Sequence, residues 1–259
     1  MDRPDPPDPA DDLALALALA DAADAVTLPR FLAADLRVTR KPDRTPVTDA
    51  DTAAEDALRA LLATERPGDA VLGEEGGGAV GAGRGWVLDP VDGTKNFSRG
   101  LPVWATLIAL TVDDVPRVGV VSAPALGRRW WAARGAGAWC ADARGTRRIA
   151  VSGVADLADA YASTTDARGL GERWARLGTA VWETRAFGDF WQYCLLAEGA
   201  LDVAVDPAAN PWDLAALVPI VEEAGGALTD LRGAPGFRGG DGLATNGLLH
   251  AAALAHLGP

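Results

Sequence analysis

A strand that runs into two closely spaced carboxylates is the feature that most limits how this chain can fold. Residues 86–94 read WVLDPVDGT, so an apolar run stops at Asp89, and a second acid, Asp92, follows a Pro-Val pair. A sharp turn at this point brings both carboxylates and the Val91 carbonyl around one space. Bare acids so close together repel each other, and a divalent cation resolves that repulsion. A ligand set made only of oxygen favours Mg²⁺, Mn²⁺ or Ca²⁺.

The two residues after this acid pair are suited to holding an anion. Gly93 lets the backbone approach a ligand closely, and the N–H groups of Gly93 and Thr94 can then bind a negatively charged group. Taken alone, DPVDGT has a plainer interpretation as a turn whose aspartate caps the helix that follows. Both interpretations stand for the isolated segment.

Two further acidic segments favour a metal site. Glu74 and Glu75 precede the pair by one strand length in a GEE sequence, and Asp213 ends an NPWD segment that opens the helix LAALVPIVEEAGG. A carboxylate at a helix start could merely cap that helix. With Asp213 as a ligand, the fold would bring acids from distant segments to one cation.

Composition excludes several other kinds of chemistry. The only histidines, His250 and His256, lie in the last ten residues, which rules out an internal Ser-His-Asp triad or a histidine-ligated zinc ion. Cys140 and Cys194 form no CxxC pair, so neither a disulfide framework nor a thiolate metal site is expected, and a reducing cytoplasm fits. With 24 basic and 36 acidic residues the formal charge is −12, which argues against nucleic acid or an anionic membrane as a partner.

The chain is expected to form two closely packed halves behind a short tail. Residues 1–12, MDRPDPPDPADD, are acidic and Pro-rich without a basic region, which predicts a disordered tail rather than a signal peptide. The LALALALA run that follows is predicted to be a helix capped by Asp11 or Asp12, too short to span a bilayer. Residues 13–148 would form an N-terminal α+β half that carries the acid pair, and residues 149–259 a C-terminal α/β half.

Local patterns place the acidic segments on particular elements. Residues 48–63 have helical spacing after Thr48, a good N-cap. Residues 103–112 and 117–122 form an expected hairpin around an Asp-Asp turn. Further strands are expected at residues 70–73, 86–88 and 129–133. In the second half, strand and helix signals alternate over residues 160–164, 171–177, 180–184, 189–197, 201–205, 212–223, 227–230 and 246–255.

A glycine-rich stretch contains Gly76, Gly78 and Gly81 in GxGxxG register. That spacing binds dinucleotides only where it opens a helix within a βαβ unit. Here the next expected element is the strand WVLDP, so a flexible surface loop is the better interpretation.

Four segments together resemble the signatures of a known family. GEE at residues 73–75, DPVDGTKNF at 89–97, WDLAA at 212–216 and EEAGG at 222–226 are similar to those of the inositol monophosphatase family of Mg²⁺-dependent, lithium-sensitive phosphomonoesterases. The resemblance runs from about residue 13 to residue 257. It implies an α/β fold built as a layered αβαβα sandwich, a metal cluster between the two halves and, commonly, a homodimer.

The resemblance also implies metal ligands. Glu74, Asp89 and the Val91 carbonyl would bind a first metal, and Asp89, Asp92 and Asp213 would surround a second. Two such ions, about 3.5–4 Å apart, can bridge phosphate oxygens, acidify a bound water and neutralise the leaving alkoxide. Two or three Mg²⁺ ions per subunit are therefore expected, with Mn²⁺ possible, and no protein nucleophile is needed.

The expected catalytic residues are Asp51, Glu74 and Thr94. Asp51, within PVTDAD, corresponds to a family acid that lies beside Glu74 and helps to hold the nucleophilic water or a third metal. Thr94, linked to Asp51 or Glu74, would orient this water. Thr48-x-x-Asp51 is also a capping-box variant, and an isolated helix start favours that role. Both roles can hold at once.

The second half is expected to select the phosphate ester. Residues 185–199, RAFGDFWQYCLLAEG, resemble the histidinol-phosphatase branch of the family more than the general inositol phosphatases. The expected reaction is hydrolysis of histidinol phosphate, a small-molecule phosphate monoester, to histidinol and phosphate in histidine biosynthesis. Because this substrate carries an α-ammonium and an imidazole, its pocket should offer acids, and Asp189 and Asp206 are the candidates.

The expected substrate site combines the metal loop with three residues of the second half: Asp92, Gly93, Thr94, Arg185, Asp189 and Asp206. Asp189 has an alternative role as the N-cap of a helix over residues 190–197. The aromatic residues that follow it, Phe190, Trp191 and Tyr193, are interpreted as core or dimer-interface residues.

Two other functions stay open. The chain could hydrolyse inositol 1-phosphate or a broad range of sugar phosphates by the same chemistry. A non-catalytic relative that binds phosphate or a partner is a third class. That class is expected to lack at least one metal carboxylate, whereas Glu74, Asp89, Asp92 and Asp213 are all present.

Overall fold

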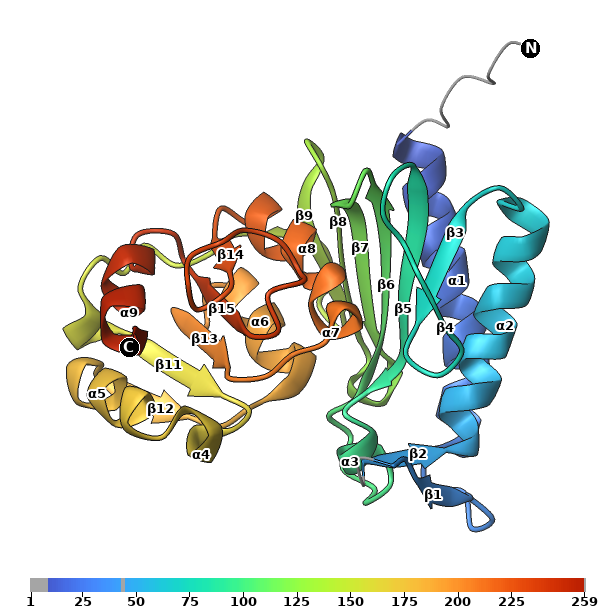
Figure 1. The fold of residues 1–259 in the computed structure, drawn as a ribbon, viewed down its shortest axis with the longest axis horizontal. Helices are drawn as coiled ribbons and strands as arrows, with labels where there is room; N and C mark the ends of the chain where they lie inside the picture. Colours follow the sequence, from blue (N-terminus) through green and yellow to red (C-terminus); the bar gives the residue numbers. More distant parts are fainter. Residues whose placement is uncertain (1–8, 43–44, 259) are drawn as a thin grey trace.

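The computed structural model describes residues 9–42 and 45–258, which form two main β-sheets and helices stacked in five layers. From one side to the other, the layers are a helical pair, an eight-stranded sheet, a central group of helices, a five-stranded sheet and an outer group of helices (Figure 1). The expected αβαβα sandwich is confirmed.

The eight-stranded sheet has the order β10-β9-β8-β7-β6-β5-β3-β4, and only the β3–β5 pair is parallel. The expected hairpin is confirmed as β6 and β7, and its turn residues Asp113 and Asp114 both have positive φ, 50° and 63°. Two successive positive φ angles are typical of tight hairpin turns. The strands are β3 (Ala70–Gly73), β4 (Gly77–Gly78), β5 (Arg84–Asp92), β6 (Ala105–Val112), β7 (Val115–Ala123), β8 (Arg128–Ala133), β9 (Gly137–Asp142) and β10 (Gly145–Ile149).

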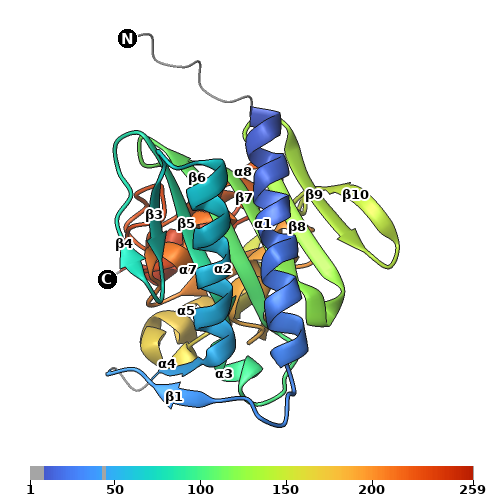
Figure 2. The ribbon, with the colours of Figure 1, turned by 90° about the vertical axis from the view of Figure 1, so that its right-hand side faces the viewer.

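Helices α1 (Pro9–Arg30) and α2 (Asp49–Glu65) cover the outer face of this sheet (Figure 2). Thr48 caps α2 as expected, because its side chain accepts a hydrogen bond from the first turn of the helix. The apolar face of α2, with Leu58 and Leu62 four residues apart, packs with Trp86 of β5 in one buried cluster.

The start of α1 differs from the expectation. Residues 9–12 are helical and not part of a disordered tail, and Asp11 and Asp12 lie in the first turn rather than at the cap. Proline and acids are both favoured in a first helical turn. Asp12 is only 4% exposed and pairs with Arg84 of β5 at 2.7 Å, which fixes this end of the helix to the sheet. Residues 1–8 of the expected tail lie outside the described residues.

The central layer consists of α6 (Asp189–Ala197), α7 (Pro211–Ala215) and α8 (Leu217–Glu223). Helix α8 packs on β7, β8 and β9 of the large sheet, whereas α6 contacts β13 (Val203–Asp206) and β15 (Gly242–Thr245) of the small sheet. Phe190 and Tyr193 of α6 are buried together with Trp130 of β8, so they belong to the core. This layer therefore joins the two sheets through one hydrophobic core.

The five-stranded sheet has the order β12-β11-β13-β15-β14. Its outer face packs against α5 and α9 in a separate buried cluster. The remaining elements of this half are β11 (Tyr161–Thr164), β12 (Glu183–Arg185), β14 (Ala227–Thr229), α4 (Ala167–Leu170), α5 (Glu172–Ala180) and α9 (His250–Leu257). A two-stranded sheet, β1 (Val38–Arg40) with β2 (Pro46–Thr48), and the short helix α3 (Thr94–Phe97) lie below the large sheet in Figure 1.

Two features near the C-terminus depart from the expected pattern. No element was expected between residues 230 and 246, where the structure has strand β15, and the last helix begins at His250 instead of residue 246. Residues 242–245 are buried between β13 and β14, so tertiary pairing overrides the weak local strand signal. The large sheet ends at Ile149 and the small sheet begins at Tyr161, and the expected domain division at residues 148 and 149 stays a prediction.

The glycine-rich stretch does not open a helix. Gly77 and Gly78 form the short strand β4, which pairs with β3, and the next element is β5. The interpretation as a dinucleotide fingerprint is therefore excluded on context. Among the described residues, no helix has both the length and the apolar character that a membrane span requires.

Gly119 of β7 lies directly under the junction of α7 and α8, and a larger residue there should destabilise the fold. A Cβ atom added at Gly119 would lie 2.0 Å from the Ala216 carbonyl oxygen, which is backbone and cannot move alone. We expect Gly119→Ala to lower the free energy of unfolding by about 1–3 kcal/mol in urea titrations. Gly68→Ala, where nothing lies within 4 Å of the added atom, is the control. Equal losses in the two variants would contradict this packing argument.

Candidate active site

Asp89 and Asp92 lie where the pairing of β5 with β6 is interrupted. Asp89 pairs with Leu107 and Asp92 pairs with Ala105, so β5 advances by three residues where β6 advances by two. Strand β5 therefore has a β-bulge between the two acids. Pro90 lies inside the bulge, where it has no N–H to donate. The Val91 N–H donates a hydrogen bond to Asp89 Oδ1 at 3.0 Å. The bulge therefore turns both carboxylates out of the sheet pattern at one point.

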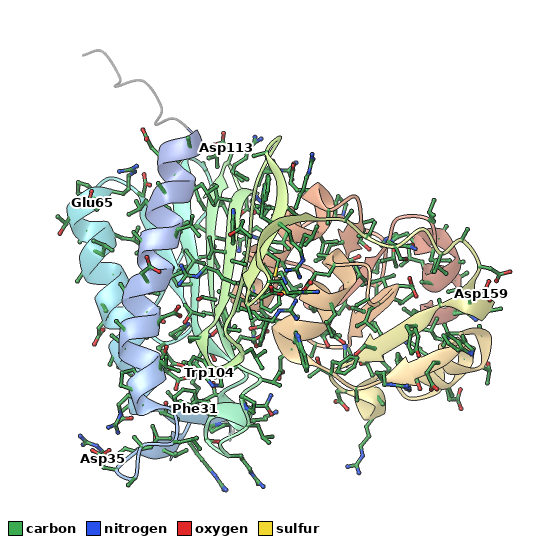
Figure 3. The ribbon with its side chains drawn as sticks, turned by 180° about the vertical axis from the view of Figure 1, so that it is seen from behind. Phe31, Asp35, Glu65, Trp104, Asp113 and Asp159 are labelled. Atoms are coloured by element: carbon green, nitrogen blue, oxygen red, sulfur yellow. The ribbon has the colours of Figure 1, made fainter. Side chains whose placement is uncertain are left out.

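An aromatic cluster fixes the helix that follows the acid pair. Gly93 has a φ of 85° and begins α3, and a Cβ atom there would lie 2.9 Å from the Val103 carbonyl oxygen. Phe97 of α3 packs edge-on against Trp104 at 4.8 Å and lies 5.5 Å from Phe31. Phe31 and Trp104 lie together near the C-terminal end of α1 (Figure 3). The chain can make this turn only with glycine.

Asp213 completes a group of three acids. It is the third residue of α7 and accepts a hydrogen bond from the Asn210 N–H at 2.7 Å, so it does form the capping box of that helix. Carboxylate oxygens of Asp89, Asp92 and Asp213 also lie within 4.8 Å of one another. Asp213 can therefore cap α7 and belong to the acid cluster at the same time, because a carboxylate has two oxygens that can each accept a contact.

Burial and mutual repulsion raise the pKa of each of these acids. Burial raises the pKa of Asp89 and of Asp92 well above the usual value, and neighbouring carboxylates raise both further. Burial also raises the pKa of Asp213 to about 7. A divalent cation would supply the missing positive charge, and a donor set made of carboxylate oxygens fits Mg²⁺ or Mn²⁺.

Glu74 lies beside this cluster, close enough for its charge to act on Asp89. Its Oε1 accepts a hydrogen bond from Lys41 Nζ at 2.7 Å, and the same ammonium lies 2.6 Å from Glu75 Oε1. Burial lowers the pKa of Lys41, but the two glutamates outweigh this effect and hold it above the usual value. The second oxygen of Glu74 has no hydrogen-bond partner in the described part of the chain, so it is available to a cation.

Asp51 and Thr94 are brought together across the start of α2. The Thr94 hydroxyl lies 3.0 Å from Asp51 Oδ1 and 2.9 Å from the Val91 carbonyl oxygen. The other oxygen of Asp51 accepts a hydrogen bond from the Thr48 N–H at 2.9 Å, so the capping box is also present. Burial raises the pKa of Asp51, which is completely buried. The two roles considered for Asp51 are therefore compatible.

Asp189 lies beside the acid cluster but does not cap its helix. Gly188 occupies the N-cap position, and the Asp189 carboxylate accepts a hydrogen bond from Asn96 Nδ2 at 3.0 Å instead. The capping alternative for Asp189 is therefore wrong. Asp189 has a φ of 48°, an uncommon conformation for any residue other than glycine, and burial raises its pKa to about 6. The next N–H group, that of Phe190, donates to Asp92 at 2.6 Å.

Asp206 and Arg185 lie further from the cluster than the other expected substrate residues. Asp206 is 7% exposed, and its two oxygens accept hydrogen bonds from Gln192 at 2.9 Å and Tyr193 at 2.8 Å. Arg185 is exposed on β12 and pairs with Glu183 at 2.9 Å. No hydrogen bond or ion pair among the described residues joins Arg185 to the acids. A substrate contact by either residue stays a prediction.

Three residues near the site were missed by the sequence analysis, and each had a weak signal. Glu55 is 2% exposed on α2 and accepts the N–H groups of Glu75 at 2.7 Å and Gly76 at 2.8 Å, so it holds the GEE turn. An acid on the apolar stripe of a predicted helix is the signal that could have found it. Lys41 was visible only as one of two lysines, and Asn96 only as part of the DPVDGTKNF segment.

Comparisons with known proteins agree with this geometry. The sequence model described as the inositol monophosphatase family matches residues 8–258. A histidinol-phosphatase of Mycobacterium tuberculosis is 57% identical over 95% of this chain and 98% of that protein, and one of Streptomyces coelicolor is 50% identical over 97% and 98%. Among solved structures, an inositol monophosphatase from Zymomonas mobilis has a TM-score of 0.84 at 34% identity, covering 97% of this chain and 99% of that one.

Mg²⁺ should stabilise this protein more at high pH than at low pH. The unfolded chain releases the Asp213 proton near pH 4, whereas the folded chain without metal keeps it until about pH 7. Above pH 4 the folded state therefore binds more protons than the unfolded state, and its stability falls as the pH rises toward 7. Because Mg²⁺ replaces these protons, the rise in Tm that it causes should grow from about pH 5 to about pH 8.

Differential scanning calorimetry with EDTA and then with excess Mg²⁺ measures this effect. Asp213→Asn serves as the control, since it removes one of the titrating groups and should flatten the pH dependence. A Tm rise of the same size at both pH values in the unmodified protein would contradict the assignment of this cluster as the cation site.

Proposed function

The chain belongs to the inositol monophosphatase family, and on that premise we propose that it hydrolyses histidinol phosphate to histidinol and phosphate. The observation that carries the proposal is Asp189, a carboxylate beside the acid cluster that forms no ion pair among the described residues, although the charge of Lys95 acts on it from a longer distance. Histidinol phosphate carries an ammonium group that such a carboxylate can bind. The histidinol-phosphatases of Mycobacterium tuberculosis and Streptomyces coelicolor support the same substrate.

The acids of the site would hold two Mg²⁺ ions, and Mn²⁺ would suit the same oxygens. Glu74, Asp89 and the Val91 carbonyl are the proposed ligands of one ion, and Asp89, Asp92 and Asp213 those of the other. The grouping of the three aspartates within 4.8 Å supports this division. When bound, the metal supplies positive charge to the phosphate oxygens and makes water more acidic. Asp51 would help to hold a third ion where one binds.

Thr94 and Asp51 are the proposed pair that orients the attacking water. The Thr94 hydroxyl has one hydrogen and two acceptors within reach, Asp51 Oδ1 at 3.0 Å and the Val91 carbonyl at 2.9 Å. Donation to either acceptor leaves a lone pair on Thr94 that can accept a hydrogen bond from water and so orient it. Because Thr48 holds the other oxygen of Asp51, this acceptor is fixed in place before substrate binds.

The start of α3 and the start of α6 would hold the two ends of the substrate. The N–H groups of Gly93 and Thr94 lie at a helix start, where they have no acceptor within the helix and can bind phosphate oxygens. Asp189, at the start of α6, would bind the ammonium group. Asp206, which accepts hydrogen bonds from Gln192 and Tyr193 of the same helix, is kept as a proposed substrate residue. Arg185 is retained as a proposed substrate residue.

We also propose that the protein works in the cytoplasm as a homodimer. Cys140 and Cys194 are both buried and free, which suits a reducing compartment. At the open edge of the small sheet, Trp182 is 66% exposed and Phe187 is 36% exposed. Large aromatic side chains exposed next to an edge strand are typical of a surface that a second copy covers.

Hydrolysis of inositol 1-phosphate is the alternative that the comparisons keep open. Inositol-1-monophosphatases of Mycobacterium leprae and Mycobacterium bovis are 38% identical to this chain over 76% and 70% of its length. Inositol 1-phosphate carries no cationic group, so the Asp189 carboxylate would have no charge of the substrate to bind. The two substrates therefore make opposite demands on one residue, and a side-by-side assay can separate them.

Asp92→Asn should abolish turnover while the protein stays folded. Asparagine has the same shape and can still accept the Phe190 N–H, but it removes one ligand charge from the cluster. We expect kcat for phosphate release at saturating Mg²⁺ to fall about 10²-fold or more. Circular dichroism checks the fold. Turnover near that of the unmodified protein would contradict the two-metal proposal.

Asp189→Asn should change specificity rather than overall activity. Loss of the charged contact should reduce kcat/KM for histidinol phosphate by roughly 1.5–3 kcal/mol in free-energy terms, with little effect on inositol 1-phosphate. Asparagine tolerates a positive φ and can still accept the hydrogen bond from Asn96, so the backbone should not change. The ratio of the two kcat/KM values isolates the charge contact from general damage. Equal losses on both esters would tell against the histidinol assignment.

A further inference from the structure

A cavity of about 630 Å³ lies between the β1–β2 hairpin and the segment that begins with α3, at the lower end of the large sheet in Figure 1. Its wall includes three cationic side chains, Arg40 at the end of β1, Lys95 in α3 and Arg99 just after α3. None of the clustered aspartates is among the described residues that line it. The cavity is therefore separate from the acid cluster and opposite to it in charge.

In the described part of the chain, none of these three cations forms an ion pair with a carboxylate, although the charge of Lys95 acts on Asp189. Most other arginines do have one, as Arg84 has Asp12 at 2.7 Å and Arg238 has Asp114 at 2.6 Å. Acids outnumber bases 36 to 24 over the whole sequence, so partners are plentiful. Like charges that share one cavity repel each other, and a bound anion would relieve that repulsion.

The size and walls of the cavity limit what the anion can be. Its volume is within the range of about 300–1,000 Å³ found for small-molecule sites, which is more room than a single phosphate group needs. The cations come from two sides, the hairpin and the α3 segment, so the ligand must present charge at more than one point. Val38 and Leu101, 47% and 52% exposed, add apolar wall next to the charges.

We propose that this cavity is a second anion site, which binds a diphosphate or a phosphorylated small molecule with two or more negative charges. The site needs no metal, so it does not depend on the reaction proposed above. It does share one residue with the candidate active site. Asn96 lines the cavity and donates a hydrogen bond to Asp189 at 3.0 Å, so an occupant would lie against a residue that holds Asp189.

Titration of metal-free protein with pyrophosphate in excess EDTA tests the proposal. EDTA removes any cation from the acid cluster, and variants of Arg40 and Arg99, which line the cavity and not the cluster, show whether saturable binding in a calorimeter occurs in the cavity. We expect affinity to fall with added NaCl, and Arg40→Gln and Arg99→Gln each to weaken binding about fivefold or more. Arg173→Gln, which removes the same charge from an exposed position on α5, is the matched control and should leave affinity unchanged.

The site itself can be followed by NMR, because the side-chain amide of Asn96 should shift as pyrophosphate binds. Fructose 1,6-bisphosphate titrated in the same way distinguishes the two ligand types within the proposal. If fructose 1,6-bisphosphate binds more tightly than pyrophosphate, the apolar wall contacts the organic part of the ligand, and the site is one for a phosphorylated small molecule. If it binds equally or more weakly, the site is one for free diphosphate. Absence of saturable binding, or equal losses in the Arg173 and Arg99 variants, would overturn the proposal.

Discussion

The structure depends on holding mutually repelling carboxylates together between two sheets. Asp89 and Asp92 are fixed by the bulge at the end of β5, and Asp213 is fixed by its place in the first turn of α7. Each position is set by backbone geometry and by packing below it, such as the close approach of Gly119 to Ala216. The core therefore offsets the electrostatic cost of the site, as is usual where function requires groups that destabilise the fold.

The same acids are partly stabilised by donors that come from the second half of the chain. The first N–H groups of α6 have no acceptor inside the helix, and that of Phe190 donates to Asp92 at 2.6 Å. At the other end of α6, Glu198 accepts a hydrogen bond from Trp130 of the large sheet at 2.8 Å. One short helix is thus anchored to the large sheet at its C-terminal end and to the acid cluster at its N-terminal end.

Parts of the site formed by residues close together in the sequence could be predicted, whereas contacts between residues far apart in the sequence could not. The segment 89–97 carries two acids, a bulge and a glycine turn within a few residues, so local rules and the family resemblance both lead to it. Glu55 and Lys41 act on residues 20 and 33 positions away, and no periodic pattern marks such contacts. Asp189 resembled a cap because an acid preceded a helix, but Gly188 takes that position with a φ of 69°.

This arrangement separates the chemistry from the choice of substrate. The contact from α6 to Asp92 is made by a backbone N–H, which is present whatever side chain residue 190 carries. The proposed contact toward the leaving group would be made by the side chain of the preceding residue, Asp189, which accepts a hydrogen bond from Asn96 and can be changed without removing that N–H. Adjacent positions on one rigid helix thus serve different purposes. A family can therefore keep one metal site and vary its substrates by changing the side chain at the start of α6.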